Sequence, residues 1–127
     1  MSNNKHILII DDESDIQAVA QLALQTVAGW EVSIASSGIE GVSLARNRAP
    51  DAILLDVMMP DMDGVMTLQE LQAHVETQDI PVILMTAKTQ LSDRQQFSKL
   101  GIAGFISKPF KAMQLASEIS GKLAWSH

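Results

Sequence analysis

The chain of 127 residues contains no cysteine, so it can form neither disulfide bonds nor thiolate metal sites. It also has no long hydrophobic run, because "ILII" at residues 7–10 and "AILL" at residues 52–55 are far too short to cross a membrane. The start of the chain has one lysine and a short apolar run that leads at once into acidic residues, which is not the pattern of a signal peptide. We therefore expect a soluble, cytoplasmic protein.

Basic residues are also scarce: 9 lysines and arginines stand against 15 acidic residues, a net charge of −6. This balance argues against a nucleic-acid-binding surface, so we expect no direct nucleic-acid binding and no membrane binding. The charge is unevenly distributed. Residues 1–81 hold 13 acids and 3 bases, whereas residues 82–127 hold 2 acids and 6 bases. The second segment therefore carries a net charge of +4.

What the chain does have is a recurring unit: a short apolar run followed by a segment with helical periodicity. The runs are residues 6–10, 31–35, 51–55, 81–85 and 103–107. Continuously apolar runs are typical of strands buried on both faces of a parallel sheet. The pattern predicts a single α/β domain over residues 1–127, with a doubly wound (βα)₅ open sheet and helices on both faces.

The segments between the runs carry local helix signals. Ser14 and Gln17 have the spacing of a capping box, and Ser37 and Glu40 repeat it. The residues that lie in phase in the last helical segment are Met113, Ala116, Ile119 and Leu123. The segment of about residues 89–100 is mostly polar and predicts a marginal fourth helix.

Ligands of open parallel sheets bind beyond the carboxyl ends of the strands, so the residues at those ends are the candidates for a site. They are Asp11, Asp12, Asp56, Thr86 and Lys108. Carboxylates without histidine or cysteine suit a hard divalent cation such as Mg²⁺. A cation, a lysine and a hydroxyl around one further carboxylate suit phosphoryl transfer to that carboxylate, because they offset charge on the phosphoryl oxygens.

The segments "LIIDDE", "LLDVMMPDMDG", "VILMTAK" and "GFISKPF" together resemble the receiver domain of two-component response regulators, such as the chemotaxis response regulators. The resemblance extends from about Lys5 to Leu123. It implies a flavodoxin-like fold with strand order 2-1-3-4-5. It also implies a phosphorylation-controlled signalling switch that changes partner binding through the face of helix 4, strand 5 and helix 5, and that has no enzymatic activity except on itself.

The resemblance assigns a role to each acidic residue of the site. Asp56 would accept a phosphoryl group from the phosphohistidine of a sensor histidine kinase or of a histidine phosphotransfer protein. Asp12 and Asp56 would bind Mg²⁺ or Mn²⁺ directly, with Asp11 close by and often bound through water. The backbone carbonyl of Met58 would be the third protein ligand.

The same resemblance gives roles to four further residues. Thr86 and Lys108 would contact the phosphoryl oxygens, and Phe105 would be the switch aromatic. The peptide bond before Pro109 is expected to be cis, a form that is essentially confined to proline. The resemblance also leaves room for a phosphorylation-dependent dimer, while it names neither the kinase nor the downstream target.

Other interpretations stay open from the residues alone. Asp11, Asp12 and Glu13 are also typical of a solvated turn at the start of a helix. An aspartate-nucleophile phosphatase is a second function, although such enzymes usually carry an acid two residues after the nucleophile, where this chain has Met58. A flavin-binding module is a third, although "DDESD" would repel a phosphate. The chain is either a stand-alone receiver or part of a larger regulator or hybrid kinase.

Overall fold

A computed structural model describes residues 5–57, 64–87, 101–108, 110–123 and 125. The expected helix of residues 89–100 lies outside these ranges, as do Met58 and Pro109. The metal-ligand prediction for Met58 and the cis-peptide prediction for Pro109 therefore stay predictions.

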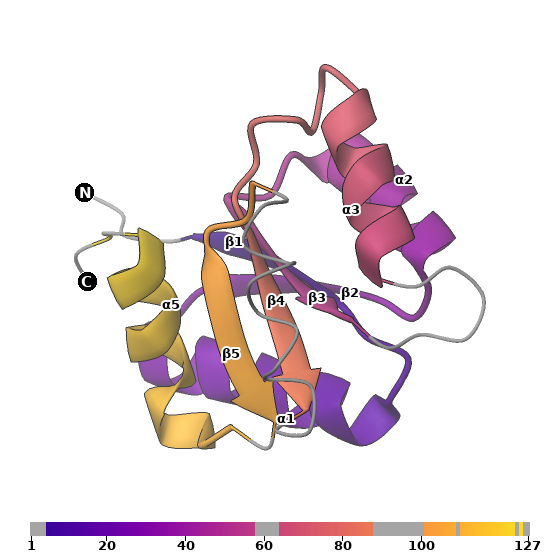
Figure 1. The fold of residues 1–127 in the computed structure, drawn as a ribbon. Helices are drawn as coiled ribbons and strands as arrows, with labels where there is room; N and C mark the ends of the chain where they lie inside the picture. The colour runs from indigo at the N-terminus through magenta and orange to yellow at the C-terminus, as the bar shows by residue number, and fades with distance from the viewer. Residues whose placement is uncertain (1–4, 58–63, 88–100, 109, 124, 126–127) are drawn as a thin grey trace.

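The centre of the fold is a five-stranded sheet in which every neighbouring pair of strands is parallel (Figure 1). The strands are β1 (His6–Ile10), β2 (Glu31–Ala35), β3 (Ala52–Asp56), β4 (Val82–Ala87) and β5 (Gly104–Lys108). Their order is β2-β1-β3-β4-β5, which confirms the predicted doubly wound fold. The last three strands extend one or two residues further than the apolar runs indicated, so Asp56, Thr86 and Lys108 belong to the strands themselves.

Helices cover both faces of this sheet (Figure 1). They are α1 (Ser14–Ala23), α2 (Gly38–Arg48), α3 (Gly64–Ala73) and α5 (Leu115–Leu123). A π-helical turn, η1 (Leu24–Ala28), continues α1 until Gly29, whose φ of 70° ends the helix, and a 3-10 turn, η3 (Ala112–Gln114), precedes α5. In the described part of the chain, no helix is long and apolar enough to span a bilayer.

Alternate residues of the buried strands form two separate cores. Ile7 and Ile9 of β1 pack with residues of α1 and α5, while Leu8 and Ile10 pack with residues of α2 and α3. Each strand side chain thus leaves the sheet on the opposite face from its neighbour, as the pleat requires. The two cores pack against both faces of the sheet, and this packing determines where the carboxyl ends of the strands place their polar residues.

Two local expectations from the sequence are wrong. The N-cap of α1 is Glu13, without a side-chain cap, and Gln17 instead donates from Nε2 to the backbone oxygen of Asp11 at 2.6 Å and to the Ser36 hydroxyl at 3.0 Å. Met113 is 75% exposed, because it belongs to the 3-10 turn η3, where the periodicity of the α-helix does not apply. The second capping prediction is confirmed in part, since the Ser37 hydroxyl accepts from the Glu40 amide at 3.1 Å.

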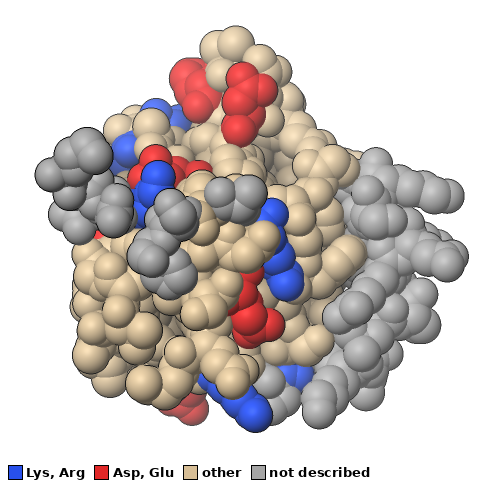
Figure 2. Space-filling view, turned by 90° about the vertical axis from the view of Figure 1, so that its left-hand side faces the viewer, with Lys and Arg blue, Asp and Glu red and all other residues tan. Residues whose placement is uncertain are grey.

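Charged residues of both signs are scattered over the face that carries α5 (Figure 2). In this view, lysine and arginine side chains lie beside aspartate and glutamate side chains, with uncharged residues between them. The described residues of this view form no extended patch of one sign, although the sequence from residue 82 onward is basic in sum.

Candidate functional site

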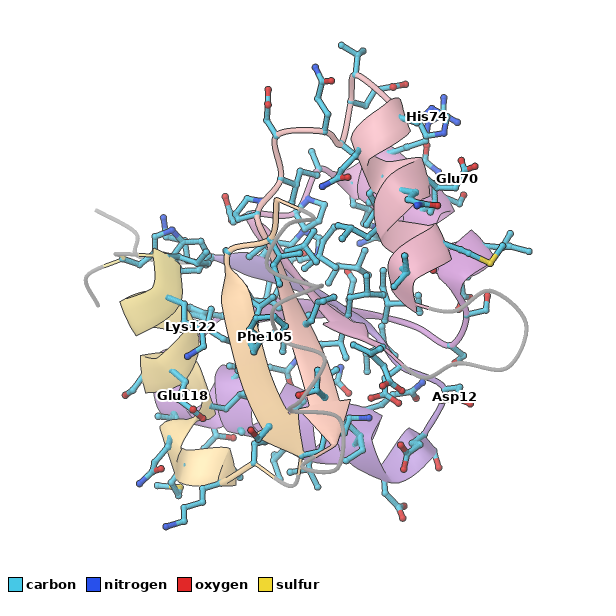
Figure 3. The ribbon with its side chains drawn as sticks, viewed as in Figure 1. Asp12, Glu70, His74, Phe105, Glu118 and Lys122 are labelled. Atoms are coloured by element: carbon cyan, nitrogen blue, oxygen red, sulfur yellow. The ribbon has the colours of Figure 1, made fainter. Side chains whose placement is uncertain are left out.

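The polar residues of three strands meet at one edge of the sheet. Asp11 follows β1 directly, Asp56 is the last residue of β3, and Lys108 is the last residue of β5. Because all strands run in the same direction, their carboxyl ends lie together, although Asp11 and Lys108 are far apart in the sequence. Figure 3 shows Asp12 at this edge, where the arrows of β4 and β5 end.

The ammonium group of Lys108 lies among three carboxylates. Its Nζ is 2.8 Å from Oδ2 of Asp11, 3.2 Å from Oε1 of Glu13 and 3.3 Å from Oδ2 of Asp56. The side chains of Asp11 and Asp56 are only 0% and 5% exposed, whereas that of Glu13 is 60% exposed. Lys108 is therefore the cation that compensates two buried negative charges.

This environment also affects the protonation of Lys108. Burial by itself would lower the pKa of the ammonium, but the contacts with Asp11, Asp56 and Glu13 outweigh it and raise the pKa above its ordinary value of 10.5. The lysine is consequently charged at every physiological pH. A fixed positive charge at this position can stabilise an anion that binds beside Asp56.

Short-range hydrogen bonds fix the orientation of Asp11. Its Oδ1 accepts from the backbone amide of Glu13 at 2.8 Å, and its backbone oxygen accepts from the Gln17 side chain. These two hydrogen bonds connect Asp11 to Glu13 and Gln17, and so they fix the turn between β1 and α1. Oδ2 of Asp11 remains directed at Lys108.

The backbone at Asp56 is held by a close approach to the start of α3. The amide of Gly64 donates to the backbone oxygen of Val57 at 3.0 Å. A Cβ atom at Gly64 would lie 2.6 Å from the backbone oxygen of Asp56, which is too close for any side chain. The glycine thus allows the first turn of α3 to contact the strand end that carries Asp56.

The acidic residues at this edge could hold a metal ion. Asp11, Asp12, Glu13 and Asp56 each offer a carboxylate oxygen, and these oxygens all lie within 4.8 Å of one another. An all-oxygen set of this size suits a hard divalent cation such as Mg²⁺. The residues present therefore fit the ion that the sequence predicted, with Glu13 as an additional member of the cluster.

Two further predicted residues lie at or near the site. Thr86 of β4 is 1% exposed, and its hydroxyl has no hydrogen-bond partner among the described residues. Phe105 of β5 is partly buried, packs against the core shared with α2 and α3, and lines a cavity of about 490 Å³ beside α5. Phe105 lies three residues before Lys108, so it is not at the carboxyl end of β5.

One contact was not predicted from the sequence, namely the ion pair between Glu13 and Lys108. The run of three acids, Asp11 to Glu13, indicated a cluster but did not show which of its members would reach the lysine.

The comparison with known families decides which family the chain belongs to. Residues 7–120 match the response regulator receiver domain. The chain belongs to this family. As a receiver domain it serves phosphorylation-dependent signalling in two-component systems, and phosphorylation and Mg²⁺ binding are typical of the family.

Curated relatives of this receiver domain are transcriptional regulators. The DNA-binding dual master transcriptional regulator RpaA of Synechocystis sp. is 37% identical over 117 residues, which are 92% of this chain and 48% of that protein. The probable transcriptional regulator ycf27 of Porphyra purpurea is 36% identical over 124 residues, or 97% of this chain and 49% of that protein. The chain thus spans about half the length of the curated relatives it matches.

These relatives correct one expectation from the sequence. We expected no direct nucleic-acid binding because the net charge is −6, but the first of these relatives is named as DNA-binding. The expectation was wrong because the charge of a receiver domain does not report on the DNA-binding properties of a regulator about twice its length.

Solved structures share the same fold. A putative response regulator from Chloroflexus aurantiacus has a TM-score of 0.87 at 29% identity and covers 96% of this chain and 99% of that one. The receiver domain of the sensor histidine kinase PA1611 from Pseudomonas aeruginosa has a TM-score of 0.83 at 28% identity and covers 95% and 98%. That structure contains a magnesium ion coordinated in its active-site cleft.

Proposed function

We propose that this receiver domain accepts a phosphoryl group on Asp56 from the phosphohistidine of a sensor histidine kinase. The observation that supports the proposal most strongly is the position of Asp56. Its buried carboxylate lies 3.3 Å from the Lys108 ammonium, within a cluster of four carboxylates that can bind a divalent ion.

In the transfer step, a carboxylate oxygen of Asp56 forms a bond to phosphorus as the bond from phosphorus to the imidazole nitrogen of the donor breaks. The leaving imidazole keeps the electron pair of that bond and later takes a proton from water. The product on this chain is a mixed anhydride, the aspartyl phosphate, which water can hydrolyse in a second step. The domain would catalyse only these two reactions of its own side chain.

The other residues would stabilise the transferring group. Asp11, Asp12 and Asp56, with the backbone carbonyl of Met58, would hold Mg²⁺ or Mn²⁺, and the ion offsets negative charge on the transferring phosphoryl group. Lys108, whose ammonium lies 3.3 Å from Asp56, would add a second positive charge. The buried hydroxyl of Thr86 would donate to a phosphoryl oxygen, because it has no partner among the described residues.

Phosphorylation would then change the binding of a downstream partner. Movement of Thr86 toward the phosphoryl group would leave space for Phe105, which lines a cavity with residues of α5 such as Glu118 and Lys122. Figure 3 shows Phe105 on β5 with both of these residues nearby on α5. The output face would comprise the segment of residues 89–100, β5 and α5, and its first part lies outside the described residues.

The test is to incubate the protein with acetyl phosphate and Mg²⁺ and to measure its intact mass. We expect one added phosphoryl group that is lost in hydroxylamine, as an acyl phosphate is. Asp56→Asn should take up none. Asp51→Asn is the matched control, because Asp51 is an exposed acid that immediately precedes the same strand. Uptake of a hydroxylamine-labile phosphate by Asp56→Asn would show that another carboxylate is the acceptor.

A further inference from the structure

The three carboxylates around Lys108 differ in how easily each could leave it. Asp11 and Asp56 are almost fully buried, so separating either from the ammonium would remove a positive charge from a place that water cannot reach. Glu13 is 60% exposed and lies at the N-cap of α1, where water can solvate its carboxylate. Of these three contacts, the one from Glu13 to Lys108 therefore costs least to break.

A phosphoryl group on Asp56 would compete for the same ammonium. A lysine ammonium has three N–H donors, and in this structure three carboxylates lie within 3.3 Å of it. The phosphoryl oxygens would add further acceptors and would bring more negative charge close to Glu13. Like charges that share one cation repel each other, so the most solvated carboxylate should give way.

We propose that Glu13 is a positioning residue that holds Lys108 in the unphosphorylated state and is displaced when the phosphoryl group arrives. This inference rests on the proposed function, because it requires Lys108 to contact the group on Asp56. Glu13 would then slow phosphorylation, since its contact with Lys108 must break before the transition state forms. It would act through Lys108, by holding the ammonium at 3.2 Å, and not as a group that takes part in the transfer.

Two substitutions separate this contact from a general effect of charge. Glu13→Gln removes the charge, while Glu13→Asp keeps the charge but shortens the side chain by one methylene, so that the 3.2 Å contact with Lys108 is lost. We expect both variants to take up phosphate from acetyl phosphate faster at saturating Mg²⁺. The increase should be about two- to fivefold, the range for an exposed ion pair.

The matched control is Asp15→Asn. Asp15 is an exposed acid in the first turn of the same helix, and it is not among the carboxylates described next to Lys108. Its rate should equal that of the wild type. If Asp15→Asn and Glu13→Gln both take up phosphate faster than the wild type by the same factor, while Glu13→Asp keeps the wild-type rate, the effect is one of charge alone and the proposal is wrong.

A double-mutant cycle tests whether Glu13 acts through Lys108. In the background of Lys108→Met, Glu13→Gln should no longer change the rate, because the ammonium that it holds is absent. A purely structural role of Glu13 would persist in that background and would contradict the proposal. Rates of the Glu13 variants that equal or fall below the wild-type rate would also overturn it, provided that the wild type itself is phosphorylated on Asp56. A wild type without phosphate on Asp56 would instead refute the proposed function.

Discussion

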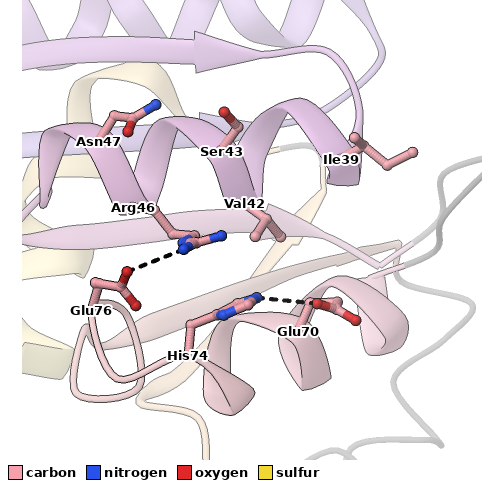
Figure 4. Close-up of a pocket in the computed structure, with 8 residues that line it drawn as sticks. All are labelled: Ile39, Val42, Ser43, Arg46, Asn47, Glu70, His74 and Glu76. Carbon is pink, nitrogen blue, oxygen red and sulfur yellow. Dashed lines mark hydrogen bonds and ion pairs between the residues drawn. The ribbon is translucent and has the colours of Figure 1, made fainter.

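Two regions of the receiver domain contain ion pairs of similar length but different surroundings. At the carboxyl edge of the sheet, Lys108 pairs with Asp11 and Asp56 at 2.8 and 3.3 Å. In a groove of about 630 Å³ between α2 and α3, Arg46 pairs with Glu76 at 3.2 Å, and Nε2 of His74 lies 3.4 Å from Oε2 of Glu70 (Figure 4).

The difference between the two regions is burial. Both side chains of the Arg46–Glu76 pair are 45% exposed, whereas Lys108 and Asp11 are 13% and 0% exposed. Water screens the groove pairs and can replace either partner, so each contributes little. Water cannot replace the partners of the buried charges at the edge. Each of these charges can therefore alter the affinity of the site for an ion or a phosphoryl group. Distance alone does not distinguish a functional cluster from a surface pair.

The largest effect should follow from removing the cation at the edge. We expect Lys108→Met to slow phosphoryl uptake from acetyl phosphate by about 100-fold, which is the size of effect that loss of one preorganised charge-stabilising group has in enzymes. Lys111→Met, which changes an exposed lysine three residues later, should keep the wild-type rate. The rates can be measured by intact mass. Equal rates for the two variants would show that Lys108 does not take part in phosphoryl transfer.

The next effect concerns the proposed magnesium site. Asp12→Ala should raise the dissociation constant for Mg²⁺ by about tenfold or more, because even the substitution of a residue that only hydrogen-bonds to a metal ligand weakens metal binding by that factor. Asp15→Ala, an exposed acid in the first turn of α1, should change the constant little. Calorimetric titration with Mg²⁺ measures both. Unchanged affinity in Asp12→Ala would show that the ion does not use this carboxylate.

Replacement by valine should destabilise the protein at one of two buried threonines and not at the other. Thr77→Val should lower the free energy of unfolding by about 1–2 kcal/mol, because Thr77 is buried and its hydroxyl donates to the backbone oxygen of Leu71 at 2.5 Å, a hydrogen bond that valine cannot make. Thr86→Val should leave stability nearly unchanged, because its hydroxyl has no partner among the described residues.

The two variants should also differ in signalling. Thr86→Val should be phosphorylated but show a reduced change in its amide NMR spectrum upon phosphorylation, while Thr77→Val should show the full change. Urea unfolding supplies the stabilities. A full spectral change in Thr86→Val would argue against a role of Thr86 in the switch.

The smallest effect is expected in the groove. A hydrogen bond from its own backbone amide and the contact with Arg46 lower the pKa of the Glu76 carboxyl below its ordinary value of 4.5. A lowered pKa in the folded state gives stability that is present above the pKa of the unfolded chain and is lost as the pH falls through the folded pKa. Glu76→Gln should therefore have a slightly lower melting temperature than the wild type at pH 7, and the difference should shrink as the pH falls below 4.5. A difference that grows in acid would contradict this assignment.

Much of the site could be predicted from the sequence because topology determines it. Five apolar runs of strand length require a parallel sheet with crossover helices, and the residues at the strand ends must then lie at one edge. Asp11, Asp56 and Lys108 are brought together for this reason, although no local pattern connects them.

Side-chain partners could not be predicted in the same way. Gln17 could have capped its helix, but it contacts Asp11 and Ser36, because the turn between β1 and α1 brings other acceptors within its reach. The contact of Glu13 with Lys108 joins residues 95 positions apart and depends on the rotamers of two long side chains. Sequence periodicity also failed at Met113, because it assumes that the α-helix has already begun.

The central claim is that the carboxylate of Asp56 is the phosphoryl acceptor. Its most direct test is to phosphorylate the wild-type protein with acetyl phosphate and Mg²⁺, to reduce the acyl phosphate with borohydride and to locate the reduced residue by peptide mass spectrometry. The account predicts homoserine at position 56 and unmodified Asp11 and Asp12. Homoserine at position 11 or 12, with Asp56 intact, would contradict it.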